Sequence, residues 1–492
     1  MNANIRRLAF VFVIIFGLIS VDLVYWQVID AGSLNANVGN IRNYYTSSRV
    51  LRGRIYDRNG ILLVGRLVHR GGFVQPLYYD PSLAQTIGYH SIQYLDSGLE
   101  ASLDPYLRGS QGTSLTQTYN SWLHRPVTGD NVYLTIDERV QQAAVNAINA
   151  SLAANGLPTS TPAAAIAFNP QNGQVLAMVS KPYYNATCLD SSDQRQEAAC
   201  LANIETVQGA LVNRVTNGIY PPGSTFKTFT LSAAIDAGVQ SLSTVYSGIK
   251  ATGPITIDGF TLPSSTNNLI CGDTSVSVLR AFMESDNIVF AQIGQSLGRS
   301  RFLSYAHRFQ IGSRIPFDLH VRPSEIIVPG ERFDPVALAT SAFGQGSDSV
   351  TPMQMALIAG TIADGGRMPK PTLVQAVKTP DNTQVAGDTP GTIANSVVSS
   401  GTTAQVRHAM VQVVEGQCGS GYEAQIPGVL VAGKTGTAQN ASGNPDAWFI
   451  SFAPARHPTV ATAVVVEGGG EGYNVAAPIS RQIMQAALQY GE

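Results

Sequence analysis

The first long apolar segment of the chain runs over residues 8–28 and follows Arg6 and Arg7. Its length is close to the ~20 residues that a helix needs to cross a bilayer. The next basic residue is Arg42, so the positive-inside rule leaves the N-terminus in the cytoplasm. We therefore predict a cytoplasmic tip and an uncleaved transmembrane signal-anchor over residues 1–30. The alternatives are a cleaved signal peptide and a buried core helix, but no convincing small-x-small cleavage site follows the segment.

Residues 31–155 contain short apolar runs separated by glycine and polar residues, a pattern typical of a small and mostly extended domain. Two of these runs are joined by a segment that ends in Asn59 and Gly60, and Asn-Gly accepts the positive φ angles of a tight hairpin turn. Near the end of the region, apolar residues at i, i+4 spacing predict a helix over residues 137–152. We interpret residues 31–155 as a non-catalytic N-terminal pedestal.

Residues 156–492 carry apolar runs of strand length at both ends and an alanine-rich, largely helical stretch between them. Residues 478–490 have helical periodicity as well. Strands far apart in the sequence, with helices between them, argue for an antiparallel sheet flanked by helices, an α/β architecture of the α+β kind. The runs that we predict as strands are residues 164–168, 174–179, 429–432, 447–453 and 460–466.

Composition narrows the range of functions. The chain has 492 residues, which predicts two or three domains rather than a single core. Its formal net charge of −2 provides no basic stripe, so we expect no nucleic-acid partner. Charged residues make up only 13% of the chain and few of them are lysines, so a motif that contains lysine is uncommon by chance.

A candidate nucleophile is Ser224, which directly follows Pro221, Pro222 and Gly223. These residues end any preceding element, and an apolar helix is predicted to follow them. Ser224 then lies at a helix N-terminus, where unsatisfied N–H groups and the helix dipole stabilise an oxyanion. Lys227 is one turn further on, so its amine can reach the Ser224 hydroxyl and act as a base if its pKa is lowered. The alternative is an N-capping serine followed by a solvated lysine.

Two further polar motifs complete the order Ser-x-x-Lys, Ser-Asp-Asn, Lys-Thr-Gly. Ser285 and Asn287 flank Asp286 between two apolar segments, where a polar triplet has few structural uses. Lys434 begins Lys-Thr-Gly-Thr at the end of the strand predicted over residues 429–432. A lysine on a strand edge adds positive charge for an anionic substrate and lowers the pKa of a neighbouring lysine.

Two other motif matches lack the right context. Residues 428–435 satisfy the phosphate-binding pattern Gly-x4-Gly-Lys-[Ser/Thr], but the four intervening residues are apolar and β-forming, and no strand precedes them. The predicted anchor also puts them outside the cell, away from ATP. Ser247 and Lys250 form a second Ser-x-x-Lys, but a glycine lies between them and no helix aligns the pair. We therefore expect neither an ATPase nor a second nucleophile.

With these motifs the chain resembles a class B penicillin-binding protein, and within that family the actinobacterial penicillin-binding protein A type. The resemblance covers nearly the whole chain, because further family motifs occur in the same order. It implies a penicillin-binding/β-lactamase-like transpeptidase domain over residues 156–492, carried on the pedestal. The additional motifs are residues 52–60 and 98–109 in the pedestal, then 169–182, 344–346, 351–356 and 448–449.

The resemblance implies a peptidoglycan D,D-transpeptidase, a serine acyltransferase of cell-wall synthesis that β-lactams inhibit by acylation. Ser224 would attack the D-Ala-D-Ala carbonyl of a stem peptide, with Lys227 as the base. Ser285 would relay a proton towards the departing D-alanine, and Asn287 would hold the substrate amide. The resemblance implies no cofactor.

The resemblance also assigns the Lys-Thr-Gly-Thr motif to the substrate. Lys434, Thr435 and Thr437 would bind its terminal carboxylate, and Gly436 would let its backbone approach closely. The N–H groups of Ser224 and Thr437 would form the oxyanion hole. One departure from the family is Asp286, which stands where serine is commoner and which we expect to matter little.

The partners implied are stem peptides, β-lactam antibiotics, the membrane through a single span, and a polymerising membrane glycosyltransferase that nothing in this chain indicates. The catalytic domain would be extracytoplasmic. Two alternatives stay open: a D,D-carboxypeptidase or β-lactamase-like hydrolase, and a non-catalytic β-lactam-binding sensor or scaffold. A hydrolase needs a base that activates water, and Glu284, beside Ser285, lies within an otherwise apolar segment.

The four cysteines of the chain form no Cys-x-x-Cys pair of zinc or redox type, so we predict no metal site. Buried free thiols are as compatible with the sequence as disulfides are. If disulfides form, we favour Cys188 with Cys200, which share one polar stretch, and Cys271 with Cys418, which both lie shortly before site motifs.

Overall fold

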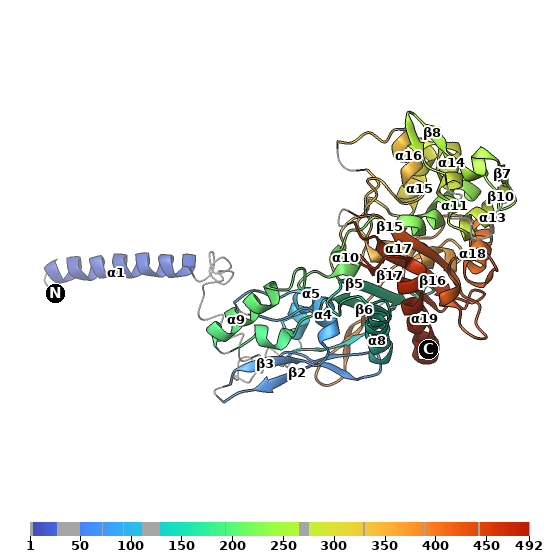
Figure 1. Ribbon diagram of the computed structural model, residues 1–492. Coiled ribbons are helices and arrows are strands. Elements are labelled where there is room, and N and C mark those ends of the chain that lie inside the picture. Colours follow the sequence, from blue (N-terminus) through green and yellow to red (C-terminus); the bar gives the residue numbers. More distant parts are fainter. Residues whose placement is uncertain are drawn as a thin grey trace.

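The computed structural model contains two large sheets with the helices that cover them, and a separate N-terminal helix (Figure 1). The residues that it describes are 3–26, 50–70, 72–91, 93–110, 128–191, 193–264, 275–327, 330–387, 389–440 and 443–491.

The N-terminal apolar segment forms α1 (Ala3–Val24), none of whose residues is buried. Its most apolar window has a mean hydropathy of 2.4, and the helix is long enough to cross a membrane. A helix that is apolar on all sides is unfavourable in water and suits lipid. The helix is therefore present, although it begins earlier and ends earlier than the apolar run, and its crossing of the membrane stays a prediction.

Residues 156–492 form a central five-stranded sheet in which every neighbouring pair of strands is antiparallel. Two strands come from one end of residues 156–492 and three from the other, so the predicted architecture is confirmed. In spatial order the strands are β15 (Ala432–Ala438), β16 (Asp446–Ala453), β17 (Val460–Val466), β5 (Ala163–Phe168) and β6 (Val175–Lys181).

Helices cover both faces of this sheet, which explains why its strands are apolar without alternation. Alternate residues of β5 belong to two different hydrophobic clusters, one on each face. On one face lie α8 (Glu138–Ala154) and α19 (Gly472–Tyr490), which pack side by side (Figure 1). On the other face lies α17 (Pro352–Ala363), which is buried along its whole length.

One strand prediction is wrong in its position. The expected strand over residues 429–432 is displaced, because β15 begins only at Ala432. Gly428 has a φ of +78°, and the N–H of Val429 donates to the carbonyl of Ile426 at 3.0 Å. The first apolar residues of the run therefore belong to this tight turn and not to the strand. The Lys-Thr-Gly-Thr motif therefore lies inside the strand rather than after it.

The helices that carry Ser224, Lys227 and Asn287 come from the part of the chain between β6 and β15. The nucleophile segment is a 3-10 turn, η4 (Gly223–Phe226), that runs directly into α11 (Lys227–Asp236). The other helices of this region are α10 (Arg214–Asn217), α12 (Ile249–Thr252), α13 (Val278–Met283), α14 (Asn287–Leu297), α15 (Arg299–Arg308), α16 (Pro335–Ser341), α18 (Ser400–Glu415) and η5 (Tyr422–Ala424). Short strand pairs accompany them: β7 (Val245–Ser247) with β10 (Ser275–Ser277), β8 (Ile255–Ile257) with β9 (Phe260–Leu262), and β11 (Met368–Pro369) with β14 (Thr392–Ala394).

The second large sheet has six strands and combines segments from both predicted domains. Its order is β13 (Gln384–Gly387), β12 (Val374–Lys378), β4 (Asn131–Leu134), β1 (Ile55–Tyr56), β2 (Leu62–Val68) and β3 (Val74–Tyr78). Short helical turns pack beside it: η2 (Pro81–Leu83), α4 (Ala84–Ile87), α5 (Gly98–Ser102), α6 (Asp104–Leu107) and η3 (Ala186–Leu189), with the longer α9 (Gln194–Glu205) further out.

Packing crosses the predicted boundary between residues 155 and 156 in both directions. The helix α8, which precedes the boundary, packs on the central sheet, whereas β12, which follows it, pairs with β4 in the second sheet. Pairing between distant strands leaves no local signal in a sequence, so the division into 31–155 and 156–492 stays a prediction.

The predicted hairpin at Asn59 and Gly60 is confirmed. It joins β1 and β2, and Gly60 has a φ of +84°. Asp57 closes the turn by accepting hydrogen bonds from the N–H groups of Asn59 at 2.8 Å and Ile61 at 2.7 Å. Its other oxygen accepts from the N–H of Glu138 at 3.2 Å, which ties the hairpin to the start of α8.

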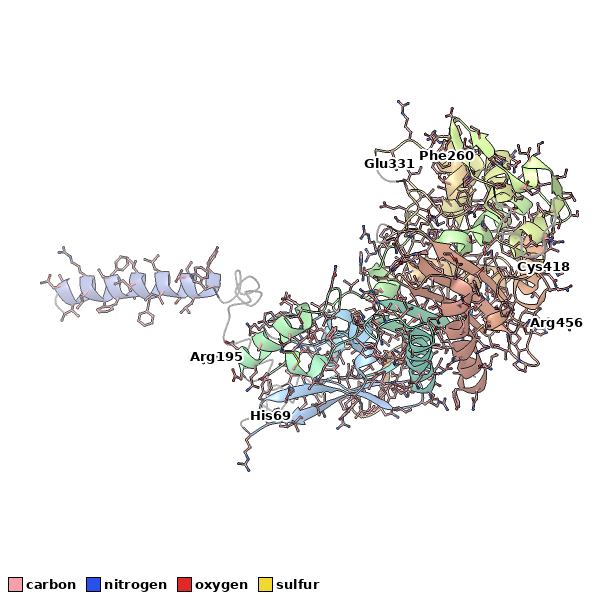
Figure 2. All side chains as sticks on the ribbon, in the orientation of Figure 1. His69, Arg195, Phe260, Glu331, Cys418 and Arg456 are labelled. Atoms are coloured by element: carbon pink, nitrogen blue, oxygen red, sulfur yellow. A yellow bond between two sulfur atoms is a disulfide. The ribbon has the colours of Figure 1, made fainter. Side chains whose placement is uncertain are left out.

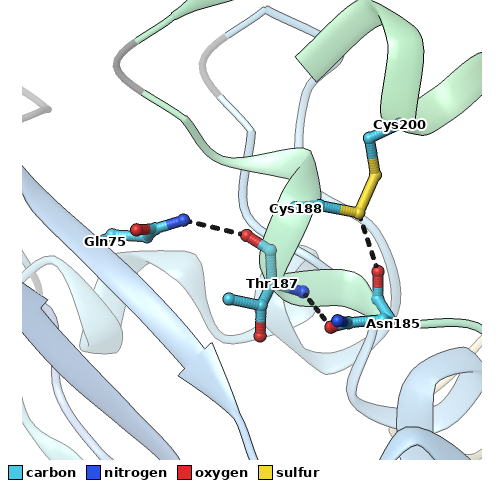
Figure 3. Close-up of a disulfide and its surroundings, with 5 residues drawn as sticks. All are labelled: Gln75, Asn185, Thr187, Cys188 and Cys200. Atoms are coloured by element: carbon cyan, nitrogen blue, oxygen red, sulfur yellow. Dashed lines mark hydrogen bonds between the residues drawn. A yellow bond between two sulfur atoms is a disulfide. The ribbon is translucent and has the colours of Figure 1, made fainter. Parts of the chain in front are cut away.

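The predicted disulfide between Cys188 and Cys200 is confirmed and joins η3 to α9 (Figure 3). Figure 3 also shows the carbonyl of Thr187 accepting from Gln75 of β3, so the bridged segment is held against the pedestal sheet. Cys418 lies on the other side of the molecule from α9 (Figure 2) and is also disulfide-bonded. Its predicted partner, Cys271, lies outside the described residues, so that pairing stays a prediction.

Candidate active site

Backbone contacts between distant glycines hold the nucleophile segment in place. Gly223 has a φ of +54°, and its N–H donates to the carbonyl of Gly344 at 2.9 Å. A Cβ on Gly344 would lie 1.9 Å from the carbonyl oxygen of Gly223, so only glycine permits this contact. Ser224 therefore lies in the 3-10 turn that leads directly into α11, which agrees with its predicted place at a helix N-terminus.

The Lys227 amine is the centre of the site. Its Nζ lies 2.9 Å from the hydroxyl oxygen of Ser224, 2.6 Å from the carbonyl oxygen of Ser285 and 2.6 Å from Oδ1 of Asn287. Carbonyl and amide oxygens only accept hydrogen bonds. In the neutral amine, two N–H groups are thus used by Ser285 and Asn287, and the lone pair is left for the Ser224 proton.

Burial favours that neutral form. Lys227 is 0% exposed, and its Nζ lies 5.6 Å from the centre of the Phe290 ring. Loss of hydration lowers the pKa of Lys227 to about 7, although the negative charge of Asp286 acts in the opposite direction. At neutral pH a large fraction of this lysine is therefore available as a base.

Lys434 reaches the same cluster from β15. Its Nζ donates to the Ser285 hydroxyl at 2.9 Å and to the carbonyl of Thr435 at 3.1 Å. Burial, and then the charge of Lys227, hold the pKa of Lys434 well below its usual value. The sequence predicted that Lys434 would lower the pKa of a neighbouring lysine, but in the structure the charge of Lys227 lowers the pKa of Lys434, and burial lowers the pKa of Lys227.

Ser285 lies between the two lysines in an unusual backbone conformation. Its φ is +65°, in the left-handed region that non-glycine residues rarely adopt. The turn between α13 and α14 imposes this angle and aims the Ser285 hydroxyl at Lys434, and at Lys227 over 3.3 Å. Strained backbone of this kind is concentrated at functional sites.

Asp286 has a larger part in the site than its sequence position suggested. It caps α14 by accepting from the N–H groups of Ile288 at 2.7 Å and Val289 at 3.3 Å. Burial raises its own pKa, and its charge raises that of Lys227. Serine could provide the cap but not the charge, so the two residues are not equivalent here, and the expectation that the difference matters little stays a prediction.

The remaining residues of the strand motif line β15. Thr435 shares a hydrogen bond of 2.9 Å with Ser420, and Thr437 donates to Oε2 of Glu471 at 2.7 Å. A Cβ on Gly436 would lie 2.8 Å from Cγ2 of Thr225. The nucleophile turn of the protein itself thus approaches this glycine closely, and the expected approach of a substrate backbone stays a prediction.

The structure thus brings Ser224, Lys227, Ser285, Asn287 and Lys434 into one hydrogen-bonded cluster. Sequence analysis did not identify Ser420, Glu471 or the role of Gly344. Ser420 and Glu471 belong to no motif that the sequence analysis used, and Gly344 was noticed only as part of a family motif.

The rejected alternatives fail in the structure as well. Residues 428–435 form a turn and a strand rather than a phosphate-binding loop. Ser247 ends β7 and Lys250 lies on the separate turn α12, where both are exposed. Glu284 is buried and pairs through Oε1 with Arg280 at 3.0 Å, while its Oε2 is buried without a hydrogen-bond partner among the described residues.

Comparison with known proteins identifies the family. The model of the penicillin-binding protein transpeptidase domain matches residues 163–485, and the chain belongs to this family of serine acyltransferases. Peptidoglycan D,D-transpeptidase PbpA of Mycobacterium tuberculosis is 34% identical over 99% of both chains, and PbpA of Mycolicibacterium smegmatis is 33% identical over the whole of both. Penicillin-binding protein A from M. tuberculosis, solved as an imipenem acyl-enzyme complex, matches with a TM-score of 0.82 and 32% identity over 90% of this chain and 99% of that one. The predicted resemblance is confirmed.

The first prediction concerns the nucleophile. Ser224→Ala should abolish covalent labelling by a fluorescent penicillin, because the Ser224 hydroxyl lies 2.9 Å from the buried Lys227 amine and directly before the helix that carries this lysine. The matched control Ser247→Ala, at the exposed Ser-x-x-Lys, should label like the wild type. Intact-mass analysis that found the penicilloyl group on another residue would contradict the assignment.

The second prediction concerns pH. The rate of acylation should rise about tenfold per pH unit below pH 7 and level off above it, as Lys227 loses its proton. Asp286→Asn keeps a capping oxygen but removes the charge that raises the Lys227 pKa, so the midpoint should move to lower pH. Asp193→Asn makes the same change at the cap of α9 and should leave the midpoint unchanged. A midpoint that moved upward in Asp286→Asn would refute the electrostatic link.

Proposed function

We propose that the chain works as a peptidoglycan D,D-transpeptidase whose acyl-enzyme forms on Ser224. The observation that carries the proposal is the set of contacts at the Lys227 amine, which leaves its lone pair facing the Ser224 hydroxyl. The fold and the relatives agree with this chemistry.

In the acylation step, Lys227 takes the Ser224 proton while Oγ attacks the carbonyl of the penultimate D-alanine. The C–N bond to the last D-alanine then breaks, and the departing nitrogen receives the proton through Lys227 and the Ser285 hydroxyl. Two distances support this relay: 3.3 Å from Lys227 Nζ to Ser285 Oγ, and 2.9 Å from there to Lys434 Nζ. The N–H groups of Ser224 and Thr437 serve as the oxyanion hole.

Substrate binding uses the free edge of β15. This strand is the last of its sheet, so its outer backbone groups are available to an extended peptide. We assign the terminal carboxylate of the substrate to Lys434, Thr435 and Thr437, and the substrate amide to Asn287. The same groups would bind the carboxylate of a β-lactam.

In the second half of the reaction an amine from a neighbouring stem peptide takes the acyl group. Its nitrogen attacks the ester carbonyl, the new C–N bond forms, the C–O bond to Ser224 breaks, and Lys227 carries the amine proton to Oγ. Glu284, beside the Ser-Asp-Asn motif in sequence, is buried with one oxygen held by Arg280 at 3.0 Å, which disfavours it as the water-activating base of a hydrolase. A non-catalytic sensor would form the acyl-enzyme but no amide product.

We also assign α1 to the membrane as a single uncleaved span with the catalytic domain outside the cell. Its length and exposed apolar surface support this assignment, as does the position of Arg6 and Arg7 before the apolar stretch. The family further implies a membrane glycosyltransferase as a partner, and α1 is the part of this chain that would meet it within the bilayer.

The third prediction tests this topology. The full-length chain should stay in the membrane fraction, and protease added outside cell-wall-stripped cells should degrade the catalytic domain. A mature protein whose N-terminal sequence begins near residue 30 would show instead that the segment is a cleaved signal peptide.

The fourth prediction separates the transpeptidase from the hydrolase. The penicilloyl adduct on Ser224 should persist for many minutes, because Lys227 serves the first proton transfers and we assign no carboxylate among the described residues to activate water against it. With a pentapeptide donor, an added amine acceptor should divert the acyl group from water to an amide product. Rapid turnover of penicillin, or D-alanine release without any amide product, would favour the hydrolase.

A further inference from the structure

A glycine-rich segment holds a carboxylate beside the Lys-Thr-Gly-Thr motif. Residues 467–472 join β17 to α19, and four of the six are glycine. A Cβ on Gly472 would lie 2.3 Å from the carbonyl oxygens of Gly436 and Trp448. The first turn of α19 therefore packs directly on β15 and β16. This contact fixes Glu471, the residue before Gly472, beside the Lys-Thr-Gly-Thr motif.

Glu471 and the substrate compete for one hydroxyl group. Thr437 Oγ1 donates to Glu471 Oε2 at 2.7 Å, and a hydroxyl has a single proton to donate. Our assignment of the substrate carboxylate to Thr437 requires that proton. A carboxylate arriving at Thr437 must therefore displace the Glu471 side chain, which is exposed and free to turn outward.

The carboxylate of Glu471 repels the terminal carboxylate of the donor peptide, but it would attract the amine of the acceptor peptide. The incoming amine attacks the acyl-enzyme from the side on which the first amine left, because the two half-reactions are reversals of each other at the carbonyl. That side is the one on which the departing D-alanine carboxylate was bound. Once D-alanine has gone, Thr437 and Glu471 are free to pair again.

We propose that Glu471 binds the ammonium group of the acceptor peptide in the second half-reaction. In the first half-reaction the donor carboxylate replaces Glu471 as the hydrogen-bond partner of Thr437. This inference rests on the proposed transpeptidase function. The acceptor class is a peptide with a primary amine that is charged in solution. Glu471 offers an ammonium group a carboxylate beside the Lys-Thr-Gly-Thr motif, next to the position where the acyl group is held.

The proton balance of the step is simple. The bound ammonium loses one proton to water, and its nitrogen then attacks the acyl carbonyl. The C–N bond forms as the bond from the carbonyl carbon to Ser224 Oγ breaks. A second proton leaves the nitrogen and reaches Oγ through Lys227, so the free enzyme is restored. Glu471 holds the acceptor and takes no part in bond breaking.

The test uses the full-length protein in detergent and the variant Glu471→Gln, which keeps an oxygen that can accept from Thr437 but removes the charge. The donor is an N-acetylated pentapeptide ending in D-Ala-D-Ala, and the acceptor is glycinamide, which has an ammonium group and no carboxylate. The KM for glycinamide should rise about fivefold, the effect of one unit charge ~4 Å away in water, with kcat little changed. Acylation by a fluorescent penicillin should become faster by a similar factor, because its carboxylate no longer meets a competing anion.

Glu423→Gln is the matched control, since it removes a charge from η5, a neighbour of α19, without touching Thr437. It should leave both measurements unchanged. A merely structural role for Glu471 would lower kcat and slow acylation instead of separating KM from kcat. An unchanged glycinamide KM in Glu471→Gln would overturn the inference.

Failure of the proposed function gives a different result. A wild-type enzyme that forms no amide product with any acceptor concentration would refute the transpeptidase, and with it the acceptor role. In that case the penicillin assay still decides the competition at Thr437, which an unchanged acylation rate in the variant would disprove.

Discussion

The requirement that Lys227 be uncharged governs the rest of the site. An ammonium group has no lone pair, so this lysine accepts the Ser224 proton only where water is excluded. The side chain is fully buried beside Phe290, and two oxygens that can only accept hydrogen bonds orient the amine. Asp286 sets the opposite limit, because its charge keeps the Lys227 pKa near neutrality instead of letting it fall further.

Such a cluster needs distances held to a fraction of an ångström by segments far apart in the chain. Glycines make this possible. Gly223 touches Gly344, Gly436 lies against Thr225, and Gly472 packs on the backbone of β15. At each of these contacts a side chain would push a strand, a turn or a helix away from its neighbour. The catalytic side chains are therefore positioned by backbone packing rather than by their own rotamers alone.

Much of this could be predicted from sequence. The approach of Lys227 to Ser224 follows from their spacing of one helical turn, and the hairpin at Gly60 follows from neighbouring residues. Both can be predicted because they depend only on residues close together in the chain. The fold class followed from the order of apolar runs, and the family from motifs in sequence order. The start of β15 was placed too early because β propensity says nothing about the competing turn at Gly428.

What the sequence by itself determined is the set of reacting groups and the elements that carry them, because these depend on residue type and short spacing. What only the tertiary structure decided is which groups meet. The charge of Asp286 raises the pKa of Lys227, and Gly436 lies against Thr225. Glu471 accepts a hydrogen bond from Thr437, and β12 extends the sheet of the pedestal. Each of these relations joins segments whose separation along the chain carries no periodic or compositional trace, so packing in three dimensions alone creates them.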